Sequence, residues 1–440
     1  MASFKRLKKN IDCLTFAVIE NKYDLRVNVS STLGKLLLVI AVALFSVPTA
    51  MSQLVQAPTK TKTFILLNHL PLQRTEIILP KVNGYTLYKG DFHVHTIYSD
   101  GDVTPRERIR EAWYDGLDVI AITDHLEIRT YEKFMLKALQ AYSKDGKPFV
   151  YAHAGIANKK NQDAPVLSNL NAGYEEALDM IDREGFPITV IRGTEIWREP
   201  SETGEYNALF LKDINAICHK DLFESFRRVK EQGGIIMHNH PGWRRETMEK
   251  SKDQIRAYAE GWVDGVEVIN DVYLYPEMID RCVDEKLTIF SNTDIHRTSA
   301  LYFPRGAHFF RTMTFIMAKD RSEEAIKEAL LDRRTIGYSY NNLVGEEKYL
   351  LEFLNEAVEC RIVDVNEKTD TRMYQLTNHC SVPFVLRMGV SSVPLNPFQS
   401  VCVSFGRDKE TGEYEEPTFV VENMWTVGDN NPKMTIKIDK

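Results

Sequence analysis

Short apolar runs alternate with amphipathic helical patterns from Tyr85 to about Asp320. The runs are rich in β-branched residues and have the length of buried strands: YTLYKGDFHVH, LDVIAITDH, ITVIRGTEIW, GGIIMHNHPGW, VDGVEVIND, KLTIFSNTDIH and HFFRTMTFIMAKD. Most of them follow helical patterns such as RERIREAWYDG and FESFRRVKEQGG. This alternation indicates an α/β fold with a parallel sheet, and over roughly 250 residues a closed or nearly closed barrel is the economical arrangement.

The chain is long enough for a large α/β domain and a smaller second domain. Its 440 residues exceed the usual length of a single domain, which is about 100–250 residues. We assign residues 85–340 to the barrel and residues 53–84 to an N-terminal extension. From about Lys348 the helical periodicity fades, and runs such as RMYQLTNHC, FVLRMGV and PTFVVENMWTV alternate apolar with polar residues. This pattern predicts a small antiparallel β-sandwich over residues 348–440.

The N-terminal residues have the pattern of a secretory signal. The apolar block LLLVIAVALFSV, Leu36 to Val47, is shorter than the roughly 20 residues needed to cross a bilayer. The small residues Ala50 and Ser52 suit cleavage before Gln53. We therefore expect a leader and signal peptide over residues 1–52, with an uncleaved membrane anchor as the alternative. The protein would be exported, periplasmic or secreted, with no stable transmembrane span after cleavage.

The net charge makes nucleic acid an unlikely partner. The whole chain carries a formal charge of −7, and loss of residues 1–52 removes seven Lys or Arg and three acidic residues, which moves the charge to −11. Proteins that bind nucleic acid rely on basic patches that displace counterions. The mature chain is too acidic to favour such binding.

Residue types that bind metal ions gather at the ends of the predicted strands. The first strand ends with the pair His93 and His95, and Asp100 follows five residues later. The ends of other strands supply His125, Glu195, His238, His240, Asp294 and His296. In a (β/α) barrel the carboxyl ends of the strands meet on one face, so these scattered residues would share one pocket.

Each of these motifs has an ordinary explanation when it is taken alone. An H-x-H pair points both rings to one face of a strand, and it is more often a packing pair than a metal site. Short motifs such as TDH and TEI are weaker evidence still. Joint placement changes this assessment, because several histidines, two aspartates and a glutamate all fall at strand ends, where a hydrophobic core needs no charge. Together they predict a polynuclear metal site.

The motifs resemble those of the polymerase and histidinol phosphatase family, known as PHP, a superfamily of metal-dependent phosphoesterases. The matching elements are DFHVHTIYSDG, AITDH, GTEI, HNHPGW and SNTDIH, in the family's order over about residues 85–300. The resemblance implies a distorted (β/α)7 TIM-like barrel. It also implies two or three divalent ions, usually zinc, manganese or iron, at the C-terminal face of the barrel.

The resemblance also assigns ligands to these ions. The first ion would be held by His93, His95, Glu195 and Asp294. Glu195 would bridge to a second ion held by His240. The third ion would be held by Asp100, His125 and His296.

One position departs from the family's pattern. About a dozen residues after the glutamate, relatives often carry a histidine, whereas this chain has Asn207 within EYNALFL. Asn207 could bind through its amide oxygen, His238 or His219 could substitute, or the second ion could be weakly held. The number of ions therefore stays open, because nitrogen ligands hold zinc-like ions better than an amide does.

Such a metal cluster suits the hydrolysis of a phosphate ester. Adjacent cations lower the pKa of a bridging water and neutralise charge on the phosphoryl group. We therefore expect attack on phosphorus by a metal-bridging hydroxide, and we assign catalysis to Asp294, His296, Glu195 and Arg297. Candidates to contact the phosphate oxygens, with solvated surface charge as the equal alternative, are Arg244, Arg245, Arg297 and Arg305. Asp91 and Asp124 would orient neighbouring histidine rings or cap strand ends.

The segment between His125 and Glu195 is long, polar and rich in turn residues. Its middle part, AYSKDGKPFVYAHAGIANKKNQDAPVLSN, suits a lid, because insertions at that face of a barrel shape substrate access. His153, Lys159 and Lys160 are candidates for substrate contacts. An ordinary helix followed by a loop is the alternative.

Two functional classes follow from these observations. The favoured one is an exported hydrolase, a metal-dependent phosphatase acting on a small phosphate monoester or diester such as a nucleotide or a sugar phosphate. The alternative is a degenerate metal-binding barrel that acts as a binding module through its C-terminal β domain. An exonuclease comes third, because the acidic chain and the predicted export both argue against it. The C-terminal domain would stabilise the barrel, bind an unknown protein partner, or bind carbohydrate through Trp425 and Tyr374.

Overall fold

The computed structural model describes residues 54–56, 64–66, 73–141, 168–196, 203–304 and 306–438. The chain divides into two units, Met1–Leu72 and Gln73–Lys440. In the first unit, the described residues form one antiparallel pair of strands, β1 (Leu54–Gln56) and β2 (Phe64–Leu66). The predicted signal peptide lies outside the described residues, as do His153, Lys159, Lys160 and Arg305. No helix within the described ranges is long and apolar enough to cross a membrane.

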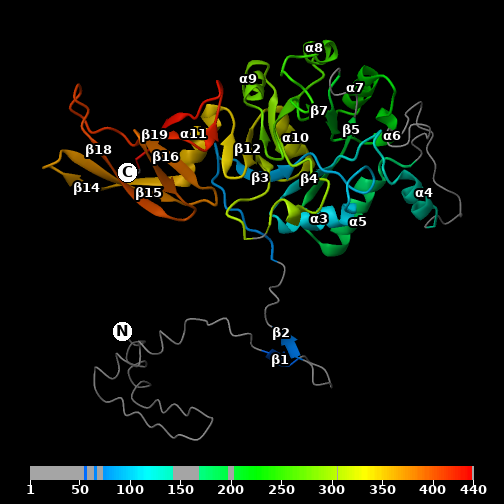
Figure 1. Ribbon diagram of the computed structural model, residues 1–440, viewed down its shortest axis with the longest axis horizontal. Coiled ribbons are helices and arrows are strands. Elements are labelled where there is room, and N and C mark those ends of the chain that lie inside the picture. The colour runs from blue at the N-terminus through cyan, green and yellow to red at the C-terminus, as the bar shows by residue number, and fades with distance from the viewer. Residues whose placement is uncertain are drawn as a thin grey trace, which may run out of the picture. The chain divides into compact units, whose positions relative to one another are not determined.

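One large mixed sheet forms the centre of the second unit (Figure 1). Its strands in spatial order are β10 (Thr288–Asn292), β8 (Gly265–Asn270), β7 (Ile235–His238), β6 (Tyr206–Leu209), β5 (Thr189–Ile196), β4 (Val119–Ile122), β3 (Thr86–Asp91), β11 (Met313–Ala318), β12 (Thr335–Ser339), β13 (Asn342–Val344) and β20 (Met424–Trp425). A short strand, β9 (Tyr273–Leu274), pairs with β8.

The sheet curls until its edge strand β10 lies beside β12. Ser291 Oγ in β10 donates to the carbonyl of Tyr338 in β12 (3.0 Å). Thr335 Oγ1 in β12 donates to the carbonyl of Ile289 in β10 (2.8 Å). Side chains thus close the gap where a regular barrel has a ladder between strands. The predicted distorted barrel is confirmed.

Helices flank the sheet on two sides. They are α3 (Pro105–Tyr114), α4 (Glu132–Ala141), α5 (Ala172–Glu184), α6 (Ile214–Ile217), α7 (Leu222–Glu231), α8 (Lys252–Ala259), α9 (Pro276–Asp284) and α10 (Glu323–Leu331). In the view of Figure 1, α3 and α5 lie below the sheet, and α7, α8 and α9 lie above it. Local signals set the helix ends: Thr104 caps α3 by accepting from the N–H of Glu107 (3.2 Å), and Gly185 ends α5 with a left-handed φ of 68°.

Several strands run against the parallel direction that the alternation predicted, among them β6 and β11. β6 pairs antiparallel with β5 and β7, and β11 pairs antiparallel with β3 and β12. A parallel connection needs a crossover of about a dozen residues or more, whereas β5 ends at Ile196 and β6 begins at Tyr206. Between β10 and β11 the described residues form only the short helix η1 (Ser299–Leu301). The first residues of β6 therefore lie at the edge where the parallel strands end.

The predicted N-terminal extension is divided between the two units. Residues from Gln73 onward belong to the second unit, and Ile77 and Val82 are buried in its core. The guanidinium of Arg74 donates to the carbonyl of Trp113 (2.8 Å) and pairs with Asp118 (2.9 Å). The last residues of the extension thus hold the end of α3 to the start of β4.

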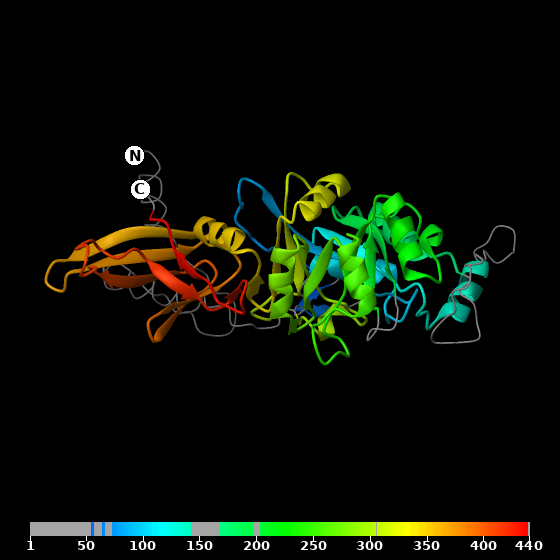
Figure 2. The ribbon, with the colours of Figure 1, turned by 90° about the horizontal axis from the view of Figure 1, so that it is seen from above.

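A helix that the sequence analysis did not predict leads into the C-terminal strands. This helix, α11 (Glu347–Ala357), begins where we expected helical periodicity to fade, so that expectation is wrong. Its buried residues Leu350, Phe353, Leu354 and Ala357 repeat with helical spacing. Figure 2 shows α11 in yellow beside the long orange strands that follow it.

The C-terminal strands form two antiparallel sheets, as predicted. One contains β14 (Val358–Asn366), β15 (Thr371–Asn378) and β18 (Ser400–Gly406). The other contains β17 (Ser391–Leu395), β16 (Phe384–Met388), β19 (Thr418–Val421) and β21 (Lys433–Thr435). The remaining C-terminal strand, β20, leaves these sheets and pairs in parallel with β13 of the barrel sheet.

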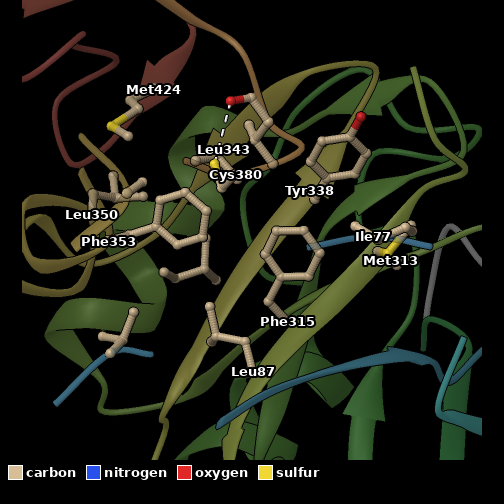
Figure 3. Packing of buried hydrophobic residues seen from close by; sticks show 14 of the residues in the cluster. Ile77, Leu87, Met313, Phe315, Tyr338, Leu343, Leu350, Phe353, Cys380 and Met424 are labelled. Carbon is tan, nitrogen blue, oxygen red and sulfur yellow. Dashed lines mark hydrogen bonds between the residues drawn. The ribbon is translucent and has the colours of Figure 1, made fainter. Parts of the chain in front are cut away.

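The barrel and the C-terminal sheets share one hydrophobic cluster, which we call the joint core (Figure 3). Phe315 of β11 stacks with Phe353 of α11, with ring centroids 6.2 Å apart, and Phe353 meets Phe384 of β16 edge to face. Tyr374 is fully buried and donates to the carbonyl of Glu415 (3.0 Å), so its ring is not available for the sugar contact that was one of three alternatives for this domain. The C-terminal region is thus continuous with the core of the barrel.

Candidate metal centre

The structure brings all eight predicted metal ligands together at the carboxyl end of the barrel strands. Each belongs to at least one group of side chains whose donor atoms lie within 4.8 Å of one another. These groups contain His93, His95, Asp100, His125, Glu195, His240, Asp294 and His296, and they also include one residue that the sequence analysis missed, Glu205. Residues separated by two hundred positions meet because strand ends converge, as expected for a barrel.

The first group places two histidine rings close to two carboxylates. His93 Nε2 lies 3.1 Å from His95 Nε2, and both nitrogens lie 3.0–3.3 Å from Asp294 Oδ1 and Glu195 Oε2. Ligand atoms of a tetrahedral zinc ion with bonds of about 2.0–2.1 Å are roughly 3.3 Å apart. His93, His95 and Glu195 therefore have the separation that one such ion requires, and Asp294 also forms a group with His93 and His240.

A second group surrounds Asp100. Its Oδ1 lies 3.4 Å from His296 Nε2, 3.6 Å from His125 Nε2 and 3.7 Å from His95 Nδ1. The His95 ring stacks between the other two imidazoles, with centroids 4.6 Å from His125 and 4.3 Å from His296. The three residues predicted for the third ion thus lie together, and His95 joins them.

A third group contains the residue that the sequence analysis missed. His240 Nε2 lies 3.0 Å from Glu205 Oε2 and 3.5 Å from Glu195 Oε1. Glu205 immediately precedes β6, and the antiparallel direction of β6 brings this end of the strand to the edge where β5 and β7 end. Glu205 therefore supplies a carboxylate to the group for which Asn207 was considered.

Asn207 orients a neighbouring side chain and is not itself a ligand in these groups. Its Nδ2 donates to the carbonyl of Phe92 (2.9 Å), and its amide oxygen accepts from Asn239 Nδ2 (2.9 Å). Asn239 Nδ2 in turn donates to Glu195 Oε1 (2.7 Å). Asn207 thus orients Asn239, which holds Glu195, and its amide oxygen is already engaged.

The two alternative histidines also lie outside these groups. His238 Nδ1 pairs with the hydroxyl of Tyr258 in α8 (2.7 Å), and burial lowers the pKa of His238 well below its usual value. His219 Nδ1 accepts from the N–H of Asp221 (3.0 Å). Neither belongs to a group of possible ligands in the described part of the chain.

Glu267, in the middle of β8, positions the first histidine. Its Oε1 lies 2.8 Å from His93 Nδ1, and its Oε2 accepts from the N–H of His240 (2.8 Å). A carboxylate that bonds the second ring nitrogen fixes the orientation of a metal-binding imidazole. The signal in the sequence was a charged residue inside the apolar run VDGVEVIND, because a charge in a buried strand is costly unless it is paired.

Asp91 and Asp124 support the loops rather than the histidine rings. Asp91 pairs with the buried Arg311 (2.6 Å) and accepts from Thr293 Oγ1 (2.6 Å). Asp124 accepts from the N–H of Thr96 (2.7 Å). Among the described contacts neither bonds an imidazole, so the orienting role predicted for them belongs to Glu267.

Arg108 joins the two loops that carry most of the cluster. From α3, its guanidinium donates to the carbonyls of His95 (3.0 Å) and Arg297 (3.0 Å). The side chain is fully buried and pairs with Glu111 (2.6 Å). One buried cation thus ties the loop after β3 to the loop after β10.

The cluster is strongly coupled electrostatically. Burial alone would lower the pKa of His95, but hydrogen bonds to Asp294 and Glu195 raise it to about 10. The pKa values of His93 and His240 are also raised well above the usual range by neighbouring carboxylates, against the effect of burial. In contrast, burial lowers the pKa of His125 to about 4. Against the effect of burial, the neighbouring histidines lower the pKa values of Asp100, Glu195 and Asp294, whereas burial raises the pKa of Glu205.

These residues fit divalent metal ions. Asp100 Oδ1 and His125 Nδ1 are buried without a hydrogen-bond partner among the described residues. The facing nitrogens of His93 and His95 cannot approach to 3.1 Å without a proton or a cation between them. Imidazole nitrogen together with carboxylate oxygen suits zinc, manganese and iron.

The predicted arginines occupy different environments. Arg297 is exposed, with Nε 3.8 Å from Asp102 Oδ2. Arg245 NH1 donates to Gln254 Oε1 (2.9 Å), which ties it to α8. Arg244 is exposed, and its guanidinium lies 5.6 Å from the centre of the Trp243 ring. Of these three, Arg244 and Arg297 are accessible to an anion.

Comparison with protein families matches residues 91–329 to the PHP domain. A crystal structure from Bacteroides vulgatus, described as a two-domain protein containing a predicted PHP-like metal-dependent phosphoesterase, is 30% identical in sequence. The alignment covers 83% of this chain and 98% of that one, with a TM-score of 0.69. Both the barrel and the C-terminal region are therefore shared with a protein of known structure.

Two more distant similarities were found. An uncharacterised protein of Methanocaldococcus jannaschii is 26% identical over 147 residues, which span 32% of this chain and 63% of that protein. A lesion-specific endonuclease of Pyrococcus furiosus is 15% identical, with a TM-score of 0.35 and coverage of 62% of each chain. The second likeness is too remote to transfer its activity.

Proposed function

Because the chain belongs to the PHP domain family, we propose that it hydrolyses a small phosphate monoester or diester by means of a metal-bridging hydroxide. The observation that carries this proposal is the place of Glu195. Its Oε2 lies with His93 and His95 in the first group, and its Oε1 lies with His240 and Glu205 in the third. One carboxylate shared by two sets of donors suits adjacent cations.

Divalent ions bound there would acidify a water molecule until it attacks phosphorus as hydroxide, and would neutralise the phosphate oxygens. The chain supplies the placement of the groups around them. Asp294 and His296 are the most exposed donors of the cluster and therefore face the substrate side. Asp294 has a left-handed φ of 51°, and its N–H donates to the carbonyl of His93 (2.9 Å), so its backbone is held in a costly conformation.

The proposed ligand set is now larger by one residue. We propose that His93, His95, Asp100, His125, Glu195, Glu205, His240, Asp294 and His296 hold two or three ions of zinc, manganese or iron. The two exposed arginines, Arg244 and Arg297, would contact the phosphate oxygens. The degenerate-barrel alternative rested on Asn207, and Glu205 removes that reason, so we do not develop it.

The test is release of inorganic phosphate from small esters by the purified protein. We expect activity that collapses with a chelator and returns with added zinc, manganese or iron. Asp294→Asn should abolish it, because it removes the carboxylate that faces both His93 and His95. Asp284→Asn, on the exposed end of α9, is the matched control and should keep full activity. Chelator-resistant hydrolysis, or full activity in Asp294→Asn, would refute the proposal.

We also propose that the protein is exported. The apolar block from Leu36 to Val47 and the small residues before Gln53 support cleavage by signal peptidase. N-terminal sequencing of the protein recovered outside the cytoplasm should begin at Gln53. Recovery of the uncleaved chain in the membrane fraction would favour the anchor instead.

A further inference from the structure

A cavity of about 280 Å³ opens beside the metal cluster. Asp294 and His296 form one side of it. The lining also includes the carboxylate residue Asp271 and the aromatic residues Trp243, Tyr273 and Tyr302. Catalytic and binding residues of a barrel lie on the loops at this face, so a molecule bound at the cluster would extend into this cavity.

Three of the four aromatic side chains that line the cavity are exposed, and the fourth, Phe303, is buried. The exposed fractions are 46% for Trp243, 55% for Tyr273 and 36% for Tyr302. They come from three separate segments: the loop after β7, the short strand β9 and the segment after η1. Large rings left open to water around one cavity are unfavourable in the free protein, and they are characteristic of a surface that binds a ring.

Asp271 is held rigidly at the turn between β8 and β9. Its φ is 52°, its N–H donates to the carbonyl of Asn292 (2.9 Å), and its own carbonyl accepts from Thr312 Oγ1 (2.8 Å) and Ser339 Oγ (3.1 Å). Within the described residues, no hydrogen bond or ion pair engages its carboxylate. A fixed backbone that presents an unengaged carboxylate to a cavity indicates a hydrogen-bond acceptor for a ligand.

The charge of the cavity restricts what can bind there. Its lining contains the carboxylates of Asp271 and Asp294 and, among the described residues, neither Lys nor Arg. A second phosphate would be repelled, which disfavours an oligonucleotide. Hydroxyl groups can donate to Asp271, and a ring face can stack on Trp243 or Tyr273.

We propose that this cavity holds the leaving group of the ester, and that this group is an uncharged ring bearing hydroxyls. A hexose and a ribonucleoside share this chemistry. The ring face would lie on Trp243 and Tyr273, and a hydroxyl would donate to Asp271. The role as a leaving-group site rests on the proposed hydrolysis, whereas the binding of the ring does not.

The test measures binding without phosphate and without hydrolysis. The whole protein, kept in chelator, is titrated with methyl glucoside, adenosine or glycerol, and binding is followed by saturation-transfer NMR. We expect one of the two rings to bind and glycerol not to bind. Trp243→Ala should weaken ring binding about fivefold or more, since stacking of a base on an aromatic side chain contributes that much. Asp271→Asn should weaken it by a similar factor, since it replaces a charged acceptor.

Val272→Ala is the matched control. Val272 lies in the same turn, is 55% exposed and does not line the cavity, so its replacement should leave binding unchanged. Ring binding that survives both Trp243→Ala and Asp271→Asn, or the absence of binding by either ring, would overturn the proposal. The ring that binds identifies the source of the leaving group.

A kinetic arm separates this inference from the proposed function. In the metal-loaded protein, Trp243→Ala should raise KM for the phosphate ester of the bound ring and leave KM for glycerol phosphate unchanged. An equal rise for both esters would contradict the cavity's role. If no ester releases phosphate in a metal-dependent manner, the proposed hydrolase activity is refuted. The ring titrations made in the presence of chelator would still decide whether the ring site exists.

Discussion

At the mouth of the barrel, His93, Glu195 and Glu267 are buried as completely as Phe315 and Phe353 are in the joint core. The two regions differ in what burial costs. Burying apolar side chains stabilises the fold, whereas burying ionisable groups is costly unless they are paired. Stability therefore explains the joint core but not the mouth. Substitutions in the joint core should therefore lower the free energy of unfolding, and substitutions at the mouth of the barrel should reduce metal binding and activity.

The largest effect at the mouth of the barrel is expected for Glu195→Gln. It removes the carboxylate that two groups of donors share, so we expect phosphate release to fall below detection and metal affinity to fall by at least about 100-fold, more than supporting residues usually cost. Isothermal titration with zinc measures the affinity. Glu184→Gln, on the exposed end of α5, is the control and should bind metal normally. Normal affinity in Glu195→Gln would contradict the shared role.

The second prediction concerns a substitution in the joint core, which should affect stability and not metal binding. Phe353→Ala removes a ring that contacts both Phe315 and Phe384, and we expect a loss of about 3–5 kcal/mol in the free energy of unfolding. The metal content per folded chain should not change. Urea denaturation measures the first quantity and elemental analysis the second. Val390→Ala, at a fully exposed turn of the same region, should change stability by no more than about 0.5 kcal/mol.

Glu267→Gln tests whether metal affinity at the mouth of the barrel depends on residues that contact the proposed ligands without being ligands themselves. The two oxygens of Glu267 accept from His240 N, Asn270 Nδ2 and Asn292 Nδ2, and one of them pairs with His93. An amide would turn one acceptor into a donor, so metal affinity should fall about 10–100-fold. Titration with zinc measures the change. If affinity is unaffected while stability falls, Glu267 is only a structural residue.

The last prediction concerns the pH dependence of metal binding, which requires no substitution. In the metal-free protein the pKa of His95 is about 10, and the pKa values of His93 and His240 are also raised. The ion pairs between these protonated histidines and the neighbouring carboxylates stabilise the metal-free fold. Their contribution is fully present below the unfolded histidine pKa of about 6.5 and is lost as the pH rises through about 10. Because a metal must displace these protons, metal affinity should instead rise with pH up to about 10, roughly tenfold per unit for each proton released.

Calorimetric titration in buffers of different ionisation enthalpy counts the protons. Release of protons on metal uptake is the expected result. Uptake without proton release, and with an affinity that does not change between pH 6 and pH 9, would show that the histidines are not charged before the metal binds.

The positions of the predicted ligands could be deduced from sequence because they lie at or shortly after the ends of short apolar strands. Strand ends are local features, and the convergence of parallel strands brings His93, His125 and Asp294 to one face wherever the connections run. The barrel and the two C-terminal sheets followed from equally local patterns. In these cases the spacing of apolar residues along the chain decides the structure.

Two of the missed features depend on information that local patterns do not contain. Glu205 joins the cluster because β6 runs antiparallel, and strand direction is decided by the whole sheet. Glu267 lies inside a strand, and only its contact with His93 explains its charge. Helix α11 was overlooked because it runs directly into β14 without a turn that would mark its end. Tertiary pairing decided the outcomes for Glu205 and Glu267, whereas the helical spacing of α11 is present in the sequence itself.

The central claim is that the mouth of the barrel exists to hold metal ions. Elemental analysis of the protein purified without chelator, and again after reconstitution, tests it most directly. The account predicts two or three ions of zinc, manganese or iron per chain, and fewer in Glu205→Gln, which removes a donor from the third group. Zero or one ion per chain, even after reconstitution, would contradict it.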